Sequence, residues 1–526
     1  MTVSRRRVLA AGALSLAAPA VVAAEKTRVL RFMPAVDLTF LDPHINTSNV
    51  TRNHGGLVFD QLYGTNAAFE AKPQMVAGHV VEDDGLTWRL TLRDGLLWHD
   101  GERVLARDCV ASIRRWAVRD VLGTEIVDLS NEILAADDKT IVFRLKRPFP
   151  MLPNALGKPN ANMPAMMPER LAKTDAYKPI PELIGSGPFR YLAAERMQGA
   201  RNVYAKFEQY VPVPTGSPDR GTGPKIVHFD RVEWTTMPDQ GTAFAALQKG
   251  EHDWWEYAAH DLMPILRKAS DIRSAVLETE GEMAIVRFNQ LHPPFNNPAI
   301  RRVILRCIDQ ADFVNAIAGG DPELQRSGVG VFAPGLPSSS TAGLDELKKP
   351  LTDAQARVEL EKAGYRGERV LQIAPADYPN VRASSEVLAD LLKRIGINLD
   401  YVQTDWGTMS GRNTKRDPID AGGTNIHTLN VPGLAVASPL LNGRLRGVGA
   451  VESGWYRNDR YEALRTAWLG ETDASKRKAL VDDMQREVLN NVAYAPCGTT
   501  FQPSAWRSDL TGILSGVAKF WNVRRA

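Results

Sequence analysis

A histidine and a carboxylate stand side by side in residues 95–108, GLLWHDGERVLARD. His99 next to Asp100 could serve general acid–base catalysis or supply ligands to a metal ion. The surrounding pattern favours a structural role instead. Residues 86–93 alternate apolar and polar side chains as a half-buried strand does, and Asp-Gly is typical of a tight turn because Gly101 accepts a positive φ. We therefore interpret this stretch as a strand, a turn and the start of a helix.

Other arrangements that carry catalysis or bind metals are missing from the sequence. No H-E-x-x-H, G-x-S-x-G, P-loop or C-x-x-C pattern occurs, and no two of the nine histidines are four residues apart. Cys109, Cys307 and Cys497 form an odd set without a disulfide framework, so we expect buried free thiols. The sequence thus points away from an enzyme and predicts no cofactor and no metal site.

Aromatic side chains near the ends of predicted strands are better candidates for function. Trp255 stands in the cluster HDWWEY, although the edge of a strand would also explain it. Asp377, Tyr378 and Trp406 each follow a predicted strand. Binding loops of α/β folds lie at the ends of strands, so we expect these side chains to line a binding site.

The elements that must position these residues alternate along the chain. Residues 283–290 and 369–376 have the pattern of strands, and residues 384–396 that of an amphipathic helix. Strands that alternate with helices along the chain predict an α/β unit with an at least partly parallel sheet. The length of 526 residues indicates two or three domains.

The N-terminus has the pattern of an export signal. Arg5, Arg6 and Arg7 precede a short apolar run, and small residues end it near Ala24, so residues 1–24 predict a cleaved signal peptide. SRRRVL also fits a twin-arginine signal. Without the three signal arginines the chain holds 61 basic and 61 acidic residues, and this balance gives no reason to expect nucleic acid as a partner. We expect a periplasmic protein, most simply a monomer.

Several ordered motifs are shared with one known family. They are W-x-x-x-L-R-x-G-x-x-W-H-D-G at 88–101, I-G-S-G-P-F at 184–189, A-L-Q-K-G-E-H-D at 246–253 and R-F-N-Q-L-H-P-P-F-N-N at 287–297. Together they resemble the extracellular solute-binding proteins of family 5, the dipeptide, oligopeptide and nickel binders of ABC importers. Leu105 and Cys109 depart from the family's usual Thr and Val.

The resemblance implies a bilobed α/β fold of the periplasmic-binding-protein type, with a hinge between two lobes and an extra subdomain inserted in the first. The expected parts are the signal peptide 1–24, lobe I at 25–55, 185–272 and 501–526, the inserted subdomain at 56–184 and lobe II at 273–500. The resemblance also implies capture of a small solute in the cleft between the lobes, without turnover. Delivery would be to an ABC permease and ATPase in the inner membrane.

The resemblance implies that residues of lobe II decide which solute is bound. Peptide binders of the family carry an Asp there that meets the α-amino group, but residues 421–439 hold no acid. A buried ammonium without a carboxylate is costly, so a standard free-amine dipeptide is in question unless another acid compensates. The expected binding residues are Trp406 and His427, followed by Tyr378, Asp377, Asn430 and Trp255.

Three alternatives stay open on the sequence. A nickel or metal-chelate binder of the same family would have His427 as its local ligand. A secreted hydrolase would need a catalytic set that is not recognisable here. A periplasmic chaperone or signalling receptor could use the same fold.

Overall fold

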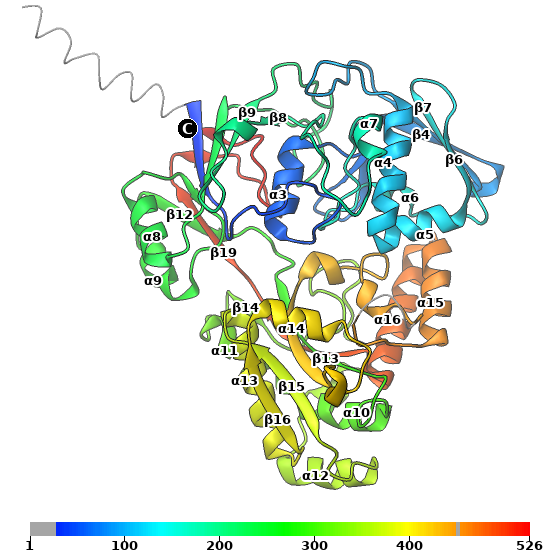
Figure 1. The fold of residues 1–526 in the computed structure, drawn as a ribbon, viewed down its shortest axis with the longest axis vertical. Coiled ribbons are helices and arrows are strands. Elements are labelled where there is room, and N and C mark those ends of the chain that lie inside the picture. Colours follow the sequence, from blue (N-terminus) through cyan, green and yellow to red (C-terminus); the bar gives the residue numbers. More distant parts are fainter. Residues whose placement is uncertain (1–27, 449–452) are drawn as a thin grey trace, which may run out of the picture.

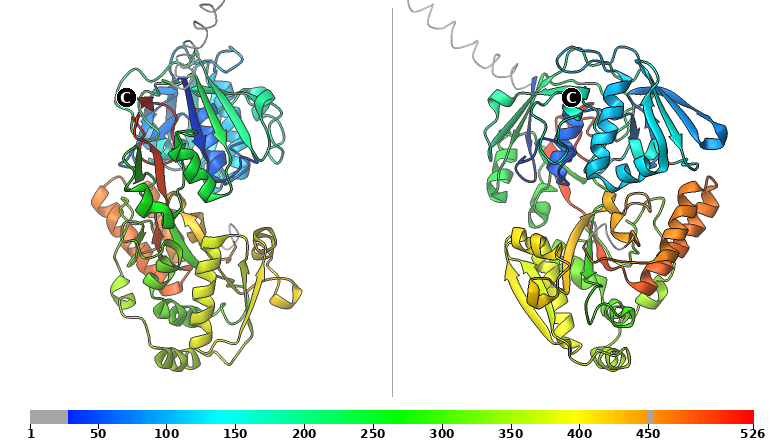
Figure 2. Two further views of the ribbon diagram at one scale, coloured as in Figure 1. Left: turned by 90° about the vertical axis from the view of Figure 1, so that its left-hand side faces the viewer. Right: turned by 45° about the vertical axis from the view of Figure 1, so that its right-hand side comes forward.

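The chain folds into two bodies joined by two crossing segments (Figures 1 and 2). The computed structural model describes residues 28–448 and 453–526, so the predicted signal peptide at 1–24 lies outside it. A seven-stranded sheet organises the upper body of Figure 1, and a six-stranded sheet organises the lower one. Residues 277–281 and 501–502 connect the two sheets. The predicted bilobed α/β fold is confirmed.

The seven-stranded sheet gathers strands from distant parts of the chain. In spatial order it contains β12 (Ile272–Val276), β19 (Pro503–Arg507), β11 (Trp254–Trp255), β1 (Val29–Met33), β10 (Arg231–Thr235), β9 (Arg201–Lys206) and β8 (Phe189–Tyr191). β1 runs parallel to both β10 and β11. An aromatic cluster fills the core beside it: the ring of Phe32 lies 5.5 Å from Trp234, 5.1 Å from Trp254 and 4.9 Å from Phe520.

The six-stranded sheet is mixed, as the alternation of strands and helices predicts. Its order is β14 (Gln325–Arg326), β18 (Tyr494–Thr500), β13 (Glu282–Phe288), β17 (Ile426–Pro432), β15 (Val370–Pro375) and β16 (Leu399–Thr404). β15 is parallel to β16 and β17, and the remaining pairs are antiparallel. The surrounding helices are α10 (Pro298–Cys307), α11 (Gln310–Ala318), α12 (Asp353–Lys362), α13 (Pro379–Arg394), α14 (Trp406–Asn413), α15 (Asp459–Gly470) and α16 (Ala474–Asn491).

A third, antiparallel sheet lies beside the seven-stranded one. It consists of β4 (Val76–Glu82), β5 (Thr87–Leu92), β7 (Thr140–Leu145) and β6 (Ser130–Ala135). α4 (Ala106–Arg119) packs on β6 and β7, and α5 (Val121–Leu129) follows it directly. The other elements of the upper body are α3 (Asn49–Val58), α6 (Leu152–Leu156), α7 (Glu169–Ala172), α8 (Gln240–Gln248), α9 (Met263–Leu266), and the strand pairs β2 (Tyr63–Thr65) with β3 (Ala71–Pro73) and β20 (Leu510–Thr511) with β21 (Arg524–Arg525).

The segment WHDG is a turn between β5 and α4, as predicted. Gly101 has a φ of +92°, which glycine adopts without strain. Asp100 accepts a hydrogen bond from Arg170 Nη2 at 2.8 Å. The ring of His99 lies 2.9 Å, through Nε2, from the carbonyl oxygen of Gly187, and burial lowers its pKa to about 4. The histidine is therefore neutral and holds the I-G-S-G-P-F segment in place.

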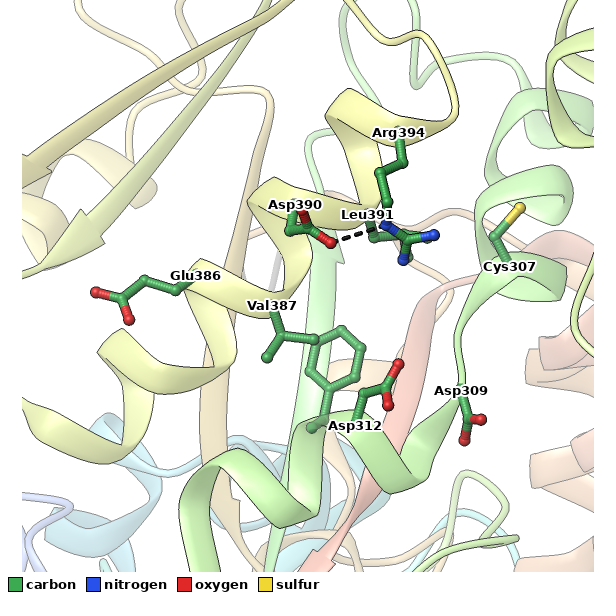
Figure 3. Close-up of a pocket in the computed structure, with 9 residues that line it drawn as sticks. Cys307, Asp309, Asp312, Glu386, Val387, Asp390, Leu391 and Arg394 are labelled. Atoms are coloured by element: carbon green, nitrogen blue, oxygen red, sulfur yellow. Dashed lines mark hydrogen bonds and ion pairs between the residues drawn. The ribbon is translucent and has the colours of Figure 1, made fainter. Parts of the chain in front are cut away.

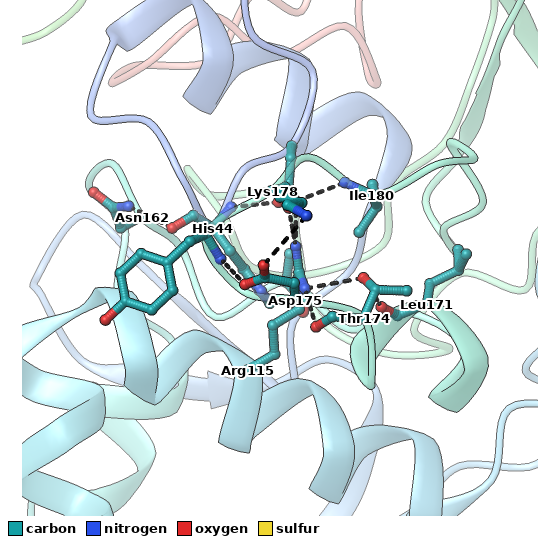
Figure 4. A network of polar contacts seen from close by, with 11 residues as sticks. His44, Arg115, Asn162, Leu171, Thr174, Asp175, Lys178 and Ile180 are labelled. Carbon is teal, nitrogen blue, oxygen red and sulfur yellow. Dashed lines mark hydrogen bonds and ion pairs between the residues drawn. The ribbon is translucent and has the colours of Figure 1, made fainter.

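The motif LDPH forms a buried junction (Figure 4). Its Asp42 carboxylate accepts a hydrogen bond at 2.8 Å from Arg115 Nη2 of α4, and both side chains are fully buried. Asp42 also accepts from the backbone N–H groups of His44 at 2.9 Å and Ile180 at 3.1 Å. Arg115 donates in addition to the carbonyl oxygen of Thr174 at 2.8 Å. These bonds tie the N-terminal segment to α4 and the loop after α7.

The strand order bears on where one lobe ends and the next begins. We propose the division at 25–55, 56–184, 185–272, 273–500 and 501–526 with one adjustment. β12 pairs along its whole length with β19 of the seven-stranded sheet, so the crossing to lobe II begins after Val276 rather than at residue 273. Cys109, Cys307 and Cys497 are free and buried, as predicted.

Candidate functional site

A cleft of about 1520 Å³ opens between the two bodies. Segments of the upper body that follow β1, β10 and β11 line it, and so do segments of the lower body at the ends of β15, β16 and β17. The main lining segments are residues 34–36, 46–50, 237–240, 255–261, 377–380, 406 and 430–432. Both sheets therefore present the carboxyl ends of parallel strands to one space, which is where α/β folds bind their ligands.

Asp377, Tyr378 and Trp406 form one cluster on the wall of the lower body. The Asp377 Oδ1 atom accepts a hydrogen bond from the backbone N–H of Trp406 at 2.8 Å. The rings of Tyr378 and Trp406 meet edge to face, with centroids 5.1 Å apart and an interplanar angle of 83°. The Trp406 residue is 37% exposed, so its indole is open to a partner in the cleft. All three residues thus line the cleft, and their contact with a solute stays a prediction.

Asn430 lines the cleft from the end of β17. Its Oδ1 atom accepts from Ser384 Oγ of α13 at 3.4 Å. Among the residues that the structure describes, the buried Nδ2 atom has no hydrogen-bond partner. A buried amide donor without a partner is costly, so this group is suited to a ligand acceptor.

Trp255 and its two successors line the opposite wall. Glu256 is buried and accepts a hydrogen bond from the backbone N–H of Ala35 at 2.8 Å. Burial raises the pKa of Glu256 to about 7. The hydroxyl of Tyr257 donates to Glu278 Oε1 at 2.7 Å. The sequence analysis named Trp255 but missed its neighbour Glu256, although the two are adjacent in the motif HDWWEY.

Glu282, at the first position of β13, is the second missed residue of the cleft. Burial raises the pKa of Glu282 to about 7, the Glu278 carboxylate adds to the increase, and Arg52 opposes it. Within the described chain its carboxylate makes no hydrogen bond or ion pair. Only the sheet topology, which puts the start of β13 beside the end of β17, reveals this residue.

The charged side chains that line the cleft are mainly carboxylates. They are Glu256, Asp261, Glu282, Asp321 and Asp377, and none of the described lining residues is Lys or Arg. A cleft with this charge attracts cations. Residues 421–439 contribute no acid to this lining, so every carboxylate in it comes from another segment.

His427 does not line the cleft, contrary to expectation. Side chains alternate along β17, so Thr428 and Asn430 face α13, where Thr428 Oγ1 donates to the carbonyl oxygen of Val381 at 3.2 Å. His427 points to the opposite face, beside Arg287 of β13. Burial lowers its pKa to about 3, and the charge of Arg287 lowers it further. The prediction for this residue is wrong because one position along a strand reverses the face.

A smaller pocket in the lower body is lined by Cys307 and several acids (Figure 3). Asp390 accepts from Arg394 Nε at 2.8 Å, so this pair is already satisfied. Burial raises the pKa of Cys307 to about 12, which keeps its thiol protonated and unreactive. Across residues 28–448 and 453–526, no three His, Cys, Asp or Glu side chains form a group that could hold a metal ion. No helix in those ranges is long and apolar enough to cross a membrane.

Comparison with known proteins gives one consistent result. The chain is 34% identical, over the full length of both chains, to a probable peptide ABC transporter periplasmic-binding protein, y4tO, of Sinorhizobium fredii. The structure of AgaA from A. tumefacien R10 in complex with agropinic acid superposes with a TM-score of 0.78 at 19% identity, covering 95% of this chain and 99% of AgaA. DppA from Helicobacter pylori in complex with the peptide STSA gives a TM-score of 0.75 at 19% identity, covering 96% and 99%.

The two superpositions show a common fold, while the sequence matches show a family. The family model described as bacterial extracellular solute-binding proteins, family 5, middle region, matches residues 70–432. That range spans β3 to β17 and includes parts of both walls of the cleft. With the full-length relative, it shows that the chain belongs to the bacterial extracellular solute-binding proteins of family 5.

Proposed function

We propose that the chain captures a peptide-like solute with a cationic group in the cleft between its two bodies. Closure about residues 277–281 and 501–502 would trap the solute for an ABC permease and ATPase in the inner membrane. The protein would work in the periplasm after export by the signal at residues 1–24. The full-length relative, whose name describes a probable peptide ABC transporter periplasmic-binding protein, supports this role.

The observation that carries the proposal is the convergence of aromatic and acidic side chains from both bodies on one cleft. Trp255 lines it from the upper body, while Tyr378 and Trp406 line it from the lower. The buried Glu256 and the half-buried Glu282 supply the carboxylates that an ammonium group needs. Such apolar walls with a few polar groups are typical of small-molecule sites.

The cleft also offers donors for the anionic end of a peptide-like solute. Its walls include the first residues of α3 and α13. Neither helix has a side-chain hydrogen bond at its N-cap, so backbone N–H groups stay available there. Carboxylates for an amine and N–H groups for a carboxylate together suit a zwitterion.

Capture by closure requires a solute that stabilises the closed state more than the open one. A solute that contacts Trp255 on one wall and Trp406 on the other meets this condition. We expect binding with a stoichiometry of one per chain and a decrease in the radius of gyration measured by small-angle X-ray scattering.

Native mass spectrometry of the protein purified from its source would identify what it carries. Calorimetry would then compare peptides that have a free amino group with their N-acetylated forms. We expect N-acetylation and Glu282→Gln each to weaken binding at least tenfold, while Glu346→Gln, an exposed acid outside the cleft, leaves it unchanged. Equal binding of the acetylated peptides would refute the cationic solute, and hydrolysis of the peptide during the titration would favour an enzyme.

A further inference from the structure

A second cavity, separate from the cleft, lies between the upper body and Leu434 of the lower body. It shares no lining residue with the cleft. Its lining comes from the upper body, through α3 and residues 59–69, 157–163, 220–225 and 516–521, and from Leu434 of the lower body. About 50 Å³ is open to the centres of water molecules, which is room for a few waters or one small anion.

The charged residues that line this cavity are all cations: Arg52, Arg220, Lys225 and Lys519. Three of them have carboxylate partners that lie outside the lining. Arg52 Nη2 is 3.2 Å from Glu278 Oε1, Arg220 pairs with Glu280, and Lys225 pairs with Asp60.

Lys519 is the exception. Among the described residues its Nζ atom makes no hydrogen bond or ion pair, and its one recorded contact is with the ring of Trp521, 5.1 Å from the centroid. Lys225 Nζ lies 4.9 Å from the centroid of the same ring, so two ammonium groups share one indole. A Cβ atom on Gly56 would lie 3.5 Å from Lys519 Nζ, so the absence of a side chain at this glycine leaves the ammonium group uncovered.

An unpaired ammonium group among like charges is unfavourable. Burial, together with the charges of Lys225, Arg52 and Arg220 and against that of Glu278, lowers the pKa of Lys519 to about 7. A bound anion would supply the missing partner and restore the charged form of Lys519. Residues 421–439, which contribute Leu434 to the cavity, contain no acid that could do so.

We propose that this cavity binds one small oxyanion group, such as a carboxylate, with the Lys519 ammonium as its charge partner and Arg52, Arg220 and Lys225 around it. The site is distinct from the carboxylate-lined cleft and does not depend on the solute proposed there. Because Leu434 belongs to the lower body, an anion held here also contacts the junction of the two bodies. The oxyanion belongs either to a free inorganic anion or to a small organic acid.

Calorimetric titration of the full chain with sodium sulfate and, separately, sodium acetate at constant ionic strength tests the site. We expect saturable binding of one anion per chain to the wild type. Lys519→Gln should weaken it at least tenfold, whereas Lys249→Gln, an exposed lysine outside the cavity, should not change it. Binding of acetate but not sulfate would assign an organic acid, and binding of both would assign a general oxyanion.

Two further measurements test the anion site independently of the cleft. Glu282→Gln should keep the wild-type anion affinity even if the proposed solute of the cleft is wrong. In buffer without oxyanions, Lys519→Gln should unfold in urea at the same concentration as the wild type or a higher one, because it removes a half-buried ammonium group without a carboxylate partner that lies among like charges. Equal anion binding by Lys519→Gln and wild type, or a clear loss of stability without anion, would overturn the proposal.

Discussion

At the residue scale, His99 shows how a pair that resembles catalytic chemistry can be structural. Its backbone N–H donates to the carbonyl oxygen of Gly185 at 2.9 Å, and its Nε2 atom contacts that of Gly187. The pKa of about 4 that follows from burial leaves the ring neutral at physiological pH. The residue therefore holds two segments of the chain together and takes no part in the cleft.

Replacing His99 tests this role. We expect His99→Ala to lower the free energy of unfolding by about 1–3 kcal/mol, because a buried hydrogen bond is lost and a carbonyl oxygen is left unpaired. Urea denaturation measures this change. Solute affinity should stay within about twofold of the wild type in the same preparation. A variant with intact stability and no binding would show that His99 belongs to the functional site.

The carboxyl group of Glu282 makes solute binding depend on pH. With a pKa raised to about 7, Glu282 is mostly protonated at pH 5.5 and mostly ionised at pH 8. A cation binds the ionised form, so affinity for a cationic solute should rise by about thirtyfold over this range and level off above pH 8. Calorimetry at several pH values measures it. The groups that face Glu282 are Glu278, Arg52 and Tyr378, and Glu282→Gln should remove most of the dependence.

Glu256 predicts a pH effect on stability with a defined sign. Its pKa is about 7 in the folded chain and near its ordinary value in the unfolded chain, so the folded state keeps the proton up to a higher pH. This contribution is complete below about pH 4.5 and disappears as the pH rises through about 7. We expect the urea midpoint of the wild type to fall between pH 5 and 8, and Glu256→Gln to show a smaller fall. A midpoint that rises equally in both proteins would contradict the assignment.

At the element scale, the positions of the strands were predictable and the facing of their side chains was not. Residues 369–376 carry the pattern of a strand, so Asp377 and Tyr378 could be assigned to its carboxyl end. Asn430 and His427 lie on one strand three residues apart, and alternation puts them on opposite faces. Choosing the right face requires knowing that α13 covers one side of β17, which is a tertiary contact.

Helices α5 and α15 connect the upper and lower bodies on the side away from the cleft (Figure 1). Glu125 of α5 accepts two hydrogen bonds from Arg465 of α15, at 2.8 and 2.7 Å. Arg446 lies 3.6 Å from the same carboxylate. Burial raises the pKa of Glu125, but hydrogen bonding and charge from Arg465 outweigh burial, and the net shift is downward. The carboxylate therefore stays ionised and holds the two bodies together.

Removing this charge should loosen the junction. We expect Glu125→Gln to enlarge the radius of gyration of the solute-free protein in small-angle X-ray scattering and to weaken solute binding several-fold. The physical reason is that Arg465, which would keep its hydrogen bond to the carbonyl oxygen of Pro439, would lose the charge of its carboxylate partner, and this favours separation of the helices. Glu132→Gln breaks an exposed pair with Arg144 and is the matched control. Identical scattering from the two variants would show that the contact does not hold the bodies together.

At the scale of the whole molecule, the sequence motifs predicted two lobes and an inserted segment, but not the charge of the spaces between them. Residues 421–439 led us to expect the ligand's partner in one stretch of lobe II. The acids that line the cleft include Glu256 after β11, Glu282 at the start of β13 and Asp377 after β15, which only the folded topology brings together. The cation cluster at Lys519 likewise joins residues more than 460 positions apart in the chain.

The place of β19 in the upper sheet has a consequence for how the protein is made. This strand, at residues 503–507, lies between β11 and β12, so the sheet that begins at residue 29 is completed only by residues from a distant part of the chain. Until β19 pairs with them, β11 and β12 expose unpaired edges, which favour aggregation. We expect a chain that stops at residue 500 to accumulate as insoluble material, measured by fractionation after expression, whereas removal of Ala526 alone is tolerated. A soluble, solute-binding truncated chain would contradict this; otherwise the upper body becomes stable only once β19 has taken its place between β11 and β12.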